Sequence, residues 1–269
     1  MLAVVGHTAR DIVDGSPPRP GGVPLYAARA LAALGERAII VTRCAEEDRK
    51  LLQPLGALGL PVVWRPEQTT PTFQLRNVGD RREITIEALG EPWSVGDVKG
   101  WLGRALAGVS WVHAGALWRG DFPAETLAAL ARGRRLSFDG QGLCRPGRTG
   151  PVSRDGDVDL SLLAPVDVLH LSRSEAEALR LDLDEPSLRT LGVPEVVVTL
   201  GSRGAVVFAR GRSEHIPAMR IEAGDATGAG DAFTIAYIVS RRTGHSPVSA
   251  GRRATSVAAA LLAKRGGRR

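Results

Sequence analysis

The sequence predicts an α/β fold in which a mostly parallel central sheet is flanked by helices on both faces. Short apolar segments alternate with longer segments of helical periodicity, and this βαβ alternation is typical of parallel sheets. Residues 195–200 are almost wholly apolar, the pattern of a strand buried on both faces. Neither an internal repeat nor an interdomain linker is visible, so residues 1–269 are expected to form one domain.

The expected elements follow one another along the whole chain. The first helix has the clearest signals, because Pro24 suits its first turn, Gly35 stands just past its end, and apolar residues recur between them at helical spacing. Parallel strands are expected at residues 2–5, 37–42, 60–64, 109–113, 135–138, 166–171 and 195–200. Helices are expected at residues 24–34, 46–58, 97–107, 121–131, 158–163, 173–181, 186–191 and 247–263.

Two further pairs of segments have the pattern of antiparallel hairpins. In the first pair, polar and apolar side chains alternate as in half-exposed strands joined by a turn. The pairs are residues 72–77 with 82–88 and residues 205–209 with 213–217. In contrast, a polar loop is expected around Asp11, and residues 145–157 form the longest irregular stretch.

Composition narrows the classes of protein that the chain could represent. No run of about 18 apolar residues exists, so no membrane span is expected, and the N-terminus lacks the basic region of a signal peptide. Cys44 and Cys144 stand far apart, which favours neither a disulfide framework nor a zinc site and fits a cytoplasmic protein. The formal charge is +6, but the arginines are scattered and aromatic residues make up only 4%, so no nucleic-acid partner is expected.

The most informative stretch is Asp225-Ala226-Thr227-Gly228-Ala229-Gly230-Asp231-Ala232-Phe233. Apolar residues recur at helical spacing after it, so a helix is expected to begin within residues 228–231. A helix start leaves backbone N–H groups without partners, and small residues leave room there for a phosphate. Asp231, in the first turn, could take a proton from an attacking hydroxyl. The alternative is that Asp231 and Thr227 only cap the helix.

Two other glycine-rich segments stand at the ends of expected elements. Thr199-Leu200-Gly201-Ser202-Arg203-Gly204-Ala205 follows the apolar strand at residues 195–200. Ligands of open parallel sheets bind beyond the carboxyl ends of the strands, and glycines let the backbone approach a nucleotide closely. Gly21-Gly22 opens the first helix. Each segment alone could also be an ordinary turn.

Residues 225–233 strongly resemble the second signature of the PfkB/ribokinase family of carbohydrate kinases. The T-x-G-x-x-G-A segment at residues 199–205 resembles the nucleotide-binding turn of that family, and the segment from Gly21 to Gly35 resembles its first signature. The resemblance covers most of the chain. It implies a ribokinase-like fold with a small β-hairpin lid near residues 70–90. The activity it implies is phosphorylation of an alcohol group on a small sugar, polyol or nucleoside, with ATP and Mg²⁺.

The resemblance also implies roles for individual residues. Asp231 would be the catalytic base, beside an anion hole of Gly228, Ala229 and Gly230. The residues implied to contact the acceptor are Asp11, Gly21, Gly22 and Tyr26. Those implied to contact the nucleotide are Ser172, Thr199, Gly201, Gly204 and Thr227. Glu175 would hold Mg²⁺ through water, or would simply form part of a helix cap, and Asp225 lies where the family often responds to K⁺.

Several features bear on the acceptor. Tyr26 and Ser172 stand where the family usually has Asn. Asp139, Gln141 and Arg145 lie in an Asp-x-Gln-Gly-x-x-Arg segment that resembles the myo-inositol kinase-like branch, which favours a myo-inositol-like acceptor. A kinase for ribose, fructose or a nucleoside, and a non-catalytic regulator on the same fold, are the alternatives. The resemblance leaves open whether the chain forms a homodimer.

Other kinds of site receive little support. The chain has neither a P-loop signature nor the motif set of a protein kinase. Its histidines are dispersed, and each is expected to be structural rather than a metal ligand. They are His7, His113, His170, His215 and His245.

Overall fold

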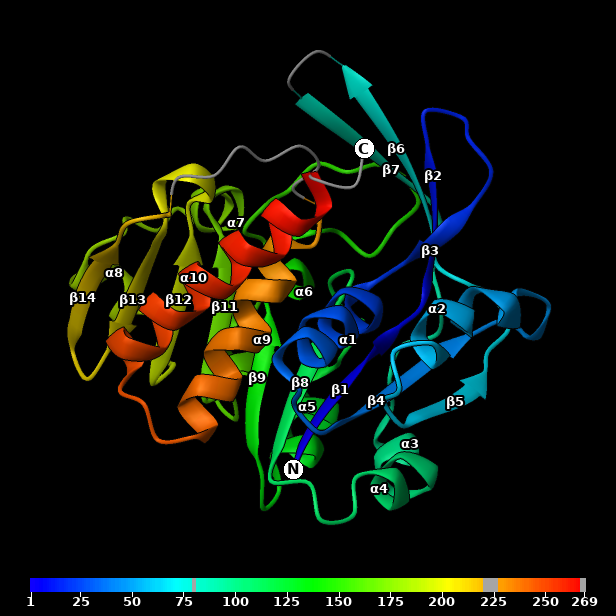
Figure 1. Ribbon diagram of the computed structural model, residues 1–269, viewed down its shortest axis with the longest axis horizontal. Coiled ribbons are helices and arrows are strands. Elements are labelled where there is room, and N and C mark those ends of the chain that lie inside the picture. Colours follow the sequence, from blue (N-terminus) through cyan, green and yellow to red (C-terminus); the bar gives the residue numbers. More distant parts are fainter. Residues whose placement is uncertain (79–80, 220–226, 267–269) are drawn as a thin grey trace.

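The computed structural model describes residues 1–78, 81–219 and 227–266 and contains a nine-stranded central sheet (Figure 1). In spatial order the strands are β14 (Arg212–Ile216), β13 (Ala205–Ala209), β12 (Glu195–Thr199), β11 (Val168–Ser172), β9 (Arg135–Asp139), β8 (Trp111–Gly115), β1 (Leu2–His7), β4 (Ala38–Cys44) and β5 (Val62–Pro66). All neighbours from β12 to β5 pair in parallel, and β13 and β14 pair antiparallel at one edge. The predicted mostly parallel sheet is therefore confirmed.

Helices cover both faces of this sheet, as predicted (Figure 1). Along β1, Leu2 and Val4 belong to one hydrophobic core and Ala3 and Val5 to the other, because successive side chains of a strand point to opposite faces. The first core is completed by α1 (Val23–Leu34), α2 (Gln53–Gly56), α9 (Ala229–Arg242) and α10 (Pro247–Gly266). The second is completed by α3 (Val95–Lys99), α4 (Trp101–Ala105), α5 (Ala124–Ala131), α6 (Gln141–Cys144), α7 (Arg173–Ala178) and α8 (Glu185–Arg189).

Three of the predicted helices differ from those observed. The segment expected at residues 97–107 is divided into α3 and α4 at Gly100, whose backbone angles (φ −101°, ψ −118°) are not helical. Residues 46–52 form the 3₁₀ segment η1 (Glu46–Leu52), with only the short α2 after it. In the segment expected at residues 158–163, only η2 (Leu160–Leu163) forms, which is the usual length of a 3₁₀ turn.

A second, five-stranded sheet projects beyond the carboxyl ends of the parallel strands (Figure 1). Its strands in order are β10 (Gly150–Pro151), β7 (Arg81–Ala88), β6 (Thr72–Val78), β2 (Ala9–Val13) and β3 (Arg19–Gly21). The predicted hairpin is confirmed as β6 and β7, but the sheet extends well outside residues 70–90. Asp11 lies on β2, which pairs with β6, and not in a loop. The stretch at residues 145–157 contributes β10. These pairings join distant segments, so local patterns do not reveal them.

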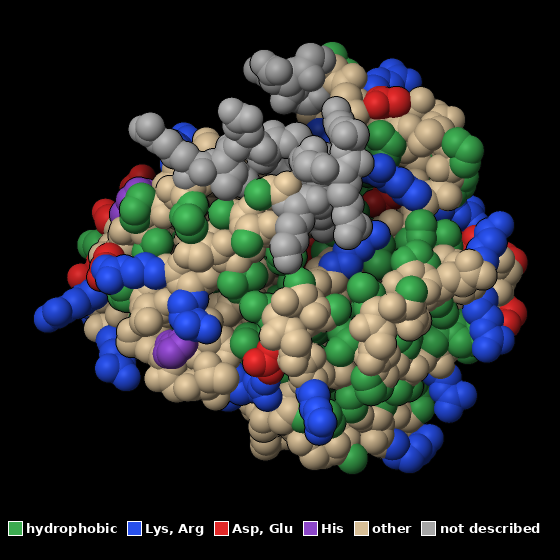
Figure 2. Space-filling view, in the orientation of Figure 1, with side chains coloured by type: hydrophobic (Ala, Val, Ile, Leu, Met, Phe, Trp, Pro, Cys, Tyr) green, Lys and Arg blue, Asp and Glu red, His purple; other side chains and the backbone are tan. Residues whose placement is uncertain are grey.

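Three features of the described residues bear on the predictions from composition. None of the helices in that part of the chain is both long and apolar enough to cross a membrane. Cys44 and Cys144 are both buried and free. On the face shown in Figure 2, the basic side chains are spread around the molecule and do not gather in one patch.

Candidate active site

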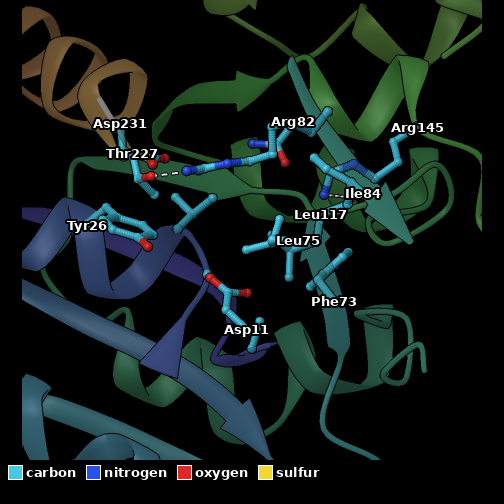
Figure 3. Close-up of a pocket in the computed structure, with 15 residues that line it drawn as sticks. Asp11, Tyr26, Phe73, Leu75, Arg82, Ile84, Leu117, Arg145, Thr227 and Asp231 are labelled. Atoms are coloured by element: carbon cyan, nitrogen blue, oxygen red, sulfur yellow. Dashed lines mark hydrogen bonds between the residues drawn. The ribbon is translucent and has the colours of Figure 1, made fainter. Parts of the chain in front are cut away.

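An inner cavity of about 180 Å³ lies between the second sheet, α1 and the start of α9 (Figure 3). One part of its wall is apolar and includes Phe73, Leu75 and Ile84 from the second sheet. The rest carries polar groups that come from segments far apart in the sequence. These groups are Asp11, Tyr26, Arg82, Gln141, Arg145, Thr227 and Asp231.

An outer cavity of about 590 Å³ adjoins the inner one on the side of β11 and β12. Ser172, Glu175, Thr199 and Gly201 line it, together with the first residues of α9. The residues that line both cavities are Gln141, Gly228 and Asp231. A reactant in either cavity would therefore lie against Asp231.

The start of α9 depends on the first glycine of the motif. Gly228 is the N-cap and has left-handed backbone angles (φ 76°, ψ 10°), which favour glycine. A Cβ atom there would lie 2.3 Å from Cδ1 of Tyr26, so the aromatic ring also requires glycine. No side chain caps this helix start, which leaves its first N–H groups for a ligand. The predicted helix start is confirmed, and the alternative of capping by Thr227 or Asp231 is not.

Asp231 is a half-buried residue, and the Oδ1 atom of its carboxyl group is buried with no hydrogen-bond partner among the described residues. Burial raises the pKa of Asp231 to about 7, and the charge of Asp139 adds to the effect. His170 acts in the opposite direction, because a positive charge favours the ionised carboxylate. A carboxyl group with a pKa near neutrality is suited to accept a proton from a hydroxyl group.

Two charged side chains stand out in the wall of the inner cavity. Burial raises the pKa of Asp11 to about 6, although Arg19 and Arg145 oppose the shift. Arg145 is only 8% exposed and lies 5.3 Å from the ring centre of Phe73. It donates a hydrogen bond of 3.0 Å to the carbonyl oxygen of Leu117, which holds it in place. Both groups are largely desolvated, so a hydroxyl-rich ligand would meet strong hydrogen-bonding partners.

The Gly21-Gly22 pair allows close backbone approach beside Asp11. A Cβ atom on Gly21 would lie 2.3 Å from Oδ2 of Asp11. Gly22 has φ +90°, and a Cβ atom there would lie 2.3 Å from the carbonyl oxygen of His7. Larger residues would push α1 away from β2 and open the inner cavity.

Arg82 connects the second sheet to the approach of α9. Its Nη1 donates a 2.7 Å hydrogen bond to Oγ1 of Thr227 (Figure 3). The hairpin of β6 and β7 is thereby tied to the segment that precedes Asp231.

In the outer cavity, Ser172 and Glu175 form a reciprocal helix cap at the start of α7. Oγ of Ser172 accepts a 3.3 Å hydrogen bond from the N–H of Glu175, and the Glu175 carboxylate accepts one of 2.7 Å from the N–H of Ser172. This is the capping alternative considered for the sequence. It explains why serine is acceptable at a position where the family usually has asparagine.

The residues present fit Mg²⁺ only when it is bound through water. Among the described residues, no group of three or more His, Cys, Asp or Glu side chains could hold a metal ion. Glu175 is 4% exposed and uses one carboxylate oxygen in the helix cap, which leaves the other oxygen able to accept a hydrogen bond from coordinated water. Asp225 lies outside the described residues.

The predicted site residues divide between the two cavities, with some exceptions. Asp139 was predicted beside the acceptor but lines the outer cavity, and Thr227 was predicted beside the nucleotide but lines the inner one. Gly21 packs on Asp11 behind the cavity wall. Gly204 lies in the turn before β13, where its φ of +95° and its contact with Ile216 explain the glycine.

The sequence analysis missed His170, which it treated as structural. Its side chain lines the outer cavity and its Nε2 lies 3.2 Å from Oγ1 of Thr199. The available signal was its place near the carboxyl end of a predicted parallel strand, where ligands bind.

The fold and the site together define the ribokinase-like class of α/β proteins. Among solved structures, the chain resembles a pyrophosphate-dependent kinase in the ribokinase family, to which it is 25% identical. The TM-score is 0.81, and the alignment covers 97% of this chain and 95% of that one. A pyrophosphate-dependent kinase of that family complexed with a pyrophosphate analog and myo-inositol has the same identity and a TM-score of 0.80, with the same coverage. The ribokinase of Arabidopsis thaliana, with ribose and ATP, is 21% identical with a TM-score of 0.72 over 97% of this chain and 92% of its own, and so supports the fold alone.

Sequence comparisons point to the same family. Residues 149–269 match the pfkB family carbohydrate kinase model. The deoxyribokinase of Salmonella typhi is 33% identical over 82 residues, which are 30% of this chain and 24% of that protein. The ribokinase of Staphylococcus aureus (strain COL) is 31% identical over 86 residues, 29% of this chain and 28% of that protein. The matched segments thus span about a quarter of the length of these curated relatives. The match of residues 149–269 and the similarity to a kinase in the ribokinase family agree with the family resemblance seen in the sequence.

Proposed function

We propose that this protein transfers a phosphoryl group to a hydroxyl group of a small sugar or polyol. The observation that carries the proposal is the position of Asp231, which lines both cavities at the glycine-containing start of α9. The inner cavity would hold the acceptor, and the outer cavity would hold the phosphoryl donor.

In this mechanism Asp231 accepts the proton of the acceptor hydroxyl as its oxygen attacks the phosphorus. The N–H groups around residues 228–230 stabilise the charge that develops on the phosphoryl oxygens. Asp11 and Arg145 orient the acceptor by hydrogen bonds, and the second sheet excludes water that would otherwise compete with it. Mg²⁺, when bound, neutralises negative charge on the donor phosphates, and Glu175 would hold it through coordinated water.

We propose a myo-inositol-like acceptor. The combination of acid, amide and guanidinium groups supports this choice, since Asp11, Gln141 and Arg145 can together bind several hydroxyl groups of one ring. The similarity to a kinase complexed with myo-inositol also supports it. Ribose, fructose and nucleosides are the competing acceptors, and the small volume of the inner cavity favours the smaller ones among them.

For the donor we propose ATP, with inorganic pyrophosphate as a second candidate. ATP follows from the glycine turn at residues 199–205, of which Thr199 and Gly201 line the outer cavity. Pyrophosphate is favoured by a specific observation: the described residues that line this cavity include no Phe, Tyr or Trp, and the ring of His170 belongs to a residue that is only 6% exposed. Little ring surface is therefore available there to stack on an adenine base. The similarity to pyrophosphate-dependent kinases agrees with that observation.

The test is a phosphoryl-transfer assay with each donor and a panel of acceptors: myo-inositol, ribose, fructose, other polyols and nucleosides. We expect one acceptor to stimulate release of ADP or phosphate. Asp231→Asn should lower kcat by roughly 100-fold or more, because the proton acceptor is lost, while donor binding persists. Binding of a donor without transfer to any acceptor would instead favour the non-catalytic regulator.

A further inference from the structure

His170 lies directly under the phosphate-binding turn of α9, with its ring packed against Gly230. A Cβ atom on Gly230 would lie 3.4 Å from Cε1 of His170 and 4.0 Å from its Nε2. The residue is 6% exposed. Its strand, β11, lies between β9 and β12, so the ring is bordered by the ends of three neighbouring parallel strands.

The neighbours of His170 determine where its protons are. Oγ1 of Thr199 donates its only hydrogen to the carbonyl oxygen of Leu171 at 3.3 Å. With its hydrogen used there, this oxygen can accept a hydrogen bond from a protonated Nε2 of His170. On the other side of the ring, Nδ1 faces Oδ1 of Asp139 at 3.9 Å and has no hydrogen-bond partner among the described residues. Both ring nitrogens thus face oxygen atoms, an arrangement that suits the doubly protonated imidazolium.

We propose that His170 is a positioning residue that supplies a fixed positive charge beneath the anion hole of residues 228–230. This charge strengthens the binding of donor phosphate there, and it keeps the neighbouring Asp231 ionised and ready to accept a proton. The inference rests on the proposed kinase function and adds to it a residue that the family signatures do not mark.

The electrostatic surroundings support a cationic His170. Burial tends to lower its pKa, but the pKa is raised overall because three carboxyl groups face the ring: Asp139 from β9, Glu175 from α7 and Asp231 from α9. The neighbouring His113, on β8, behaves differently. Burial lowers its pKa to about 4, and its Nδ1 lies 3.1 Å from Oγ of Ser137. His113 is therefore a neutral buried histidine near the same Asp139 and makes a matched control.

The test compares His170→Gln with His113→Asn in the full-length protein. Glutamine can keep the hydrogen bond to Thr199 but has no charge. We expect His170→Gln to raise the KM for the donor about tenfold and to move the acid limb of the kcat/KM profile up by about one pH unit. His113→Asn should leave both unchanged. Equal profiles for His170→Gln and the wild type would overturn the proposal.

A second measurement does not depend on catalysis. The histidine Cε1–H signals would be followed by NMR as a function of pH, and the His170 signal would be assigned by its loss in His170→Gln. The affinity for pyrophosphate would be measured separately by calorimetry. We expect the His170 signal to titrate with a pKa above the ordinary histidine value of 6.5, and pyrophosphate to bind about tenfold more weakly to His170→Gln. A neutral His170 would contradict the inference even in an active enzyme, whereas a cationic His170 in an inactive protein would contradict only the kinase function.

Discussion

At the scale of single residues, Asp231 and Gly228 are the two positions of this site with the clearest expected effects on activity and stability. Asp231 is buried beside the charges of Asp139 and Glu175, which opposes its ionisation. Because its pKa is raised to about 7, we expect kcat/KM to fall as the pH drops below about 7, by tenfold per unit. A pH–rate profile measures this directly. An acid limb near pH 4 would show that Asp231 is not the group that accepts the proton.

The same carboxyl group also affects folding stability. Its folded pKa lies above the value of 3.8 of an ordinary aspartate, so the folded state holds the proton more tightly than the unfolded chain. That contribution is fully present below about pH 4 and is lost as the pH rises through about 7. Asp231→Asn should therefore be more heat-stable than the wild type at pH 8, although inactive, and no more stable at pH 4. Melting curves at the two pH values test this.

Gly228 is the position where the helix start tolerates least change. Its left-handed backbone would cost a larger residue about 1–2 kcal/mol, and the Tyr26 ring leaves no space for a Cβ atom. We expect Gly228→Ala to lower the melting temperature and to abolish phosphate binding at α9. Gly244→Ala is a matched control, because Gly244 also has positive φ (91°) but has open space around it. Equal loss of phosphate binding in both variants would contradict the assigned role.

At the scale of elements, the contact between the second sheet and α9 matters most. The hydrogen bond from Arg82 to Thr227 joins β7 to the segment just before α9. If the second sheet shields the transfer step, Arg82→Ala should raise the KM for the acceptor and increase donor hydrolysis in the absence of acceptor. Release of ADP or phosphate without acceptor measures the leak. Arg76→Ala, which changes an exposed residue on the adjacent β6, serves as the control.

At the scale of the whole molecule, a buried ionic cluster joins three distant segments. His7 at the end of β1 lies 3.0 Å from Oε1 of Glu67 and 2.9 Å from Oδ1 of Asp121, and all three side chains are 0% exposed. Burial alone would lower the pKa of His7, but Asp121 and Glu67 raise it to about 9. The cluster thus holds together β1, the end of β5 and the loop before α5, which borders the inner cavity at Leu117.

Removal of this histidine should destabilise the fold. His7→Gln leaves two buried carboxylates without their cation, and we expect a loss of about 3–5 kcal/mol in the free energy of unfolding. The folded pKa is above the ordinary value of 6.5, so the stabilisation is fully present below about pH 6.5 and disappears as the pH rises through about 9. Denaturant titrations at pH 6.5 and 9.5 should show the difference between variant and wild type shrinking at the higher pH. A pH-independent difference would contradict this account.

Local pattern was sufficient for much of the fold and for the centre of the site. The start of α9 was predicted because small residues followed by an apolar helical repeat are a local signal, and Thr199 and Gly201 followed from their place at the end of a buried strand. In contrast, the loop predicted around Asp11 is β2, because its hydrogen bonds go to β6, about sixty residues away. Periodicity within a segment carries no information about such a partner.

The sequence by itself determined the parallel α/β architecture, the resemblance to the PfkB/ribokinase family and the glycine-rich start of α9 beside Asp231, because each depends on residues close together in the chain. The tertiary structure decided that Asp231 lines both cavities, that the second sheet draws strands from three separate regions, and that Glu175 is engaged in a helix cap. It also placed His170 between Asp139, Thr199 and Gly230. Burial and charge at a site depend on which strands lie side by side, and only the packed sheet fixes that order.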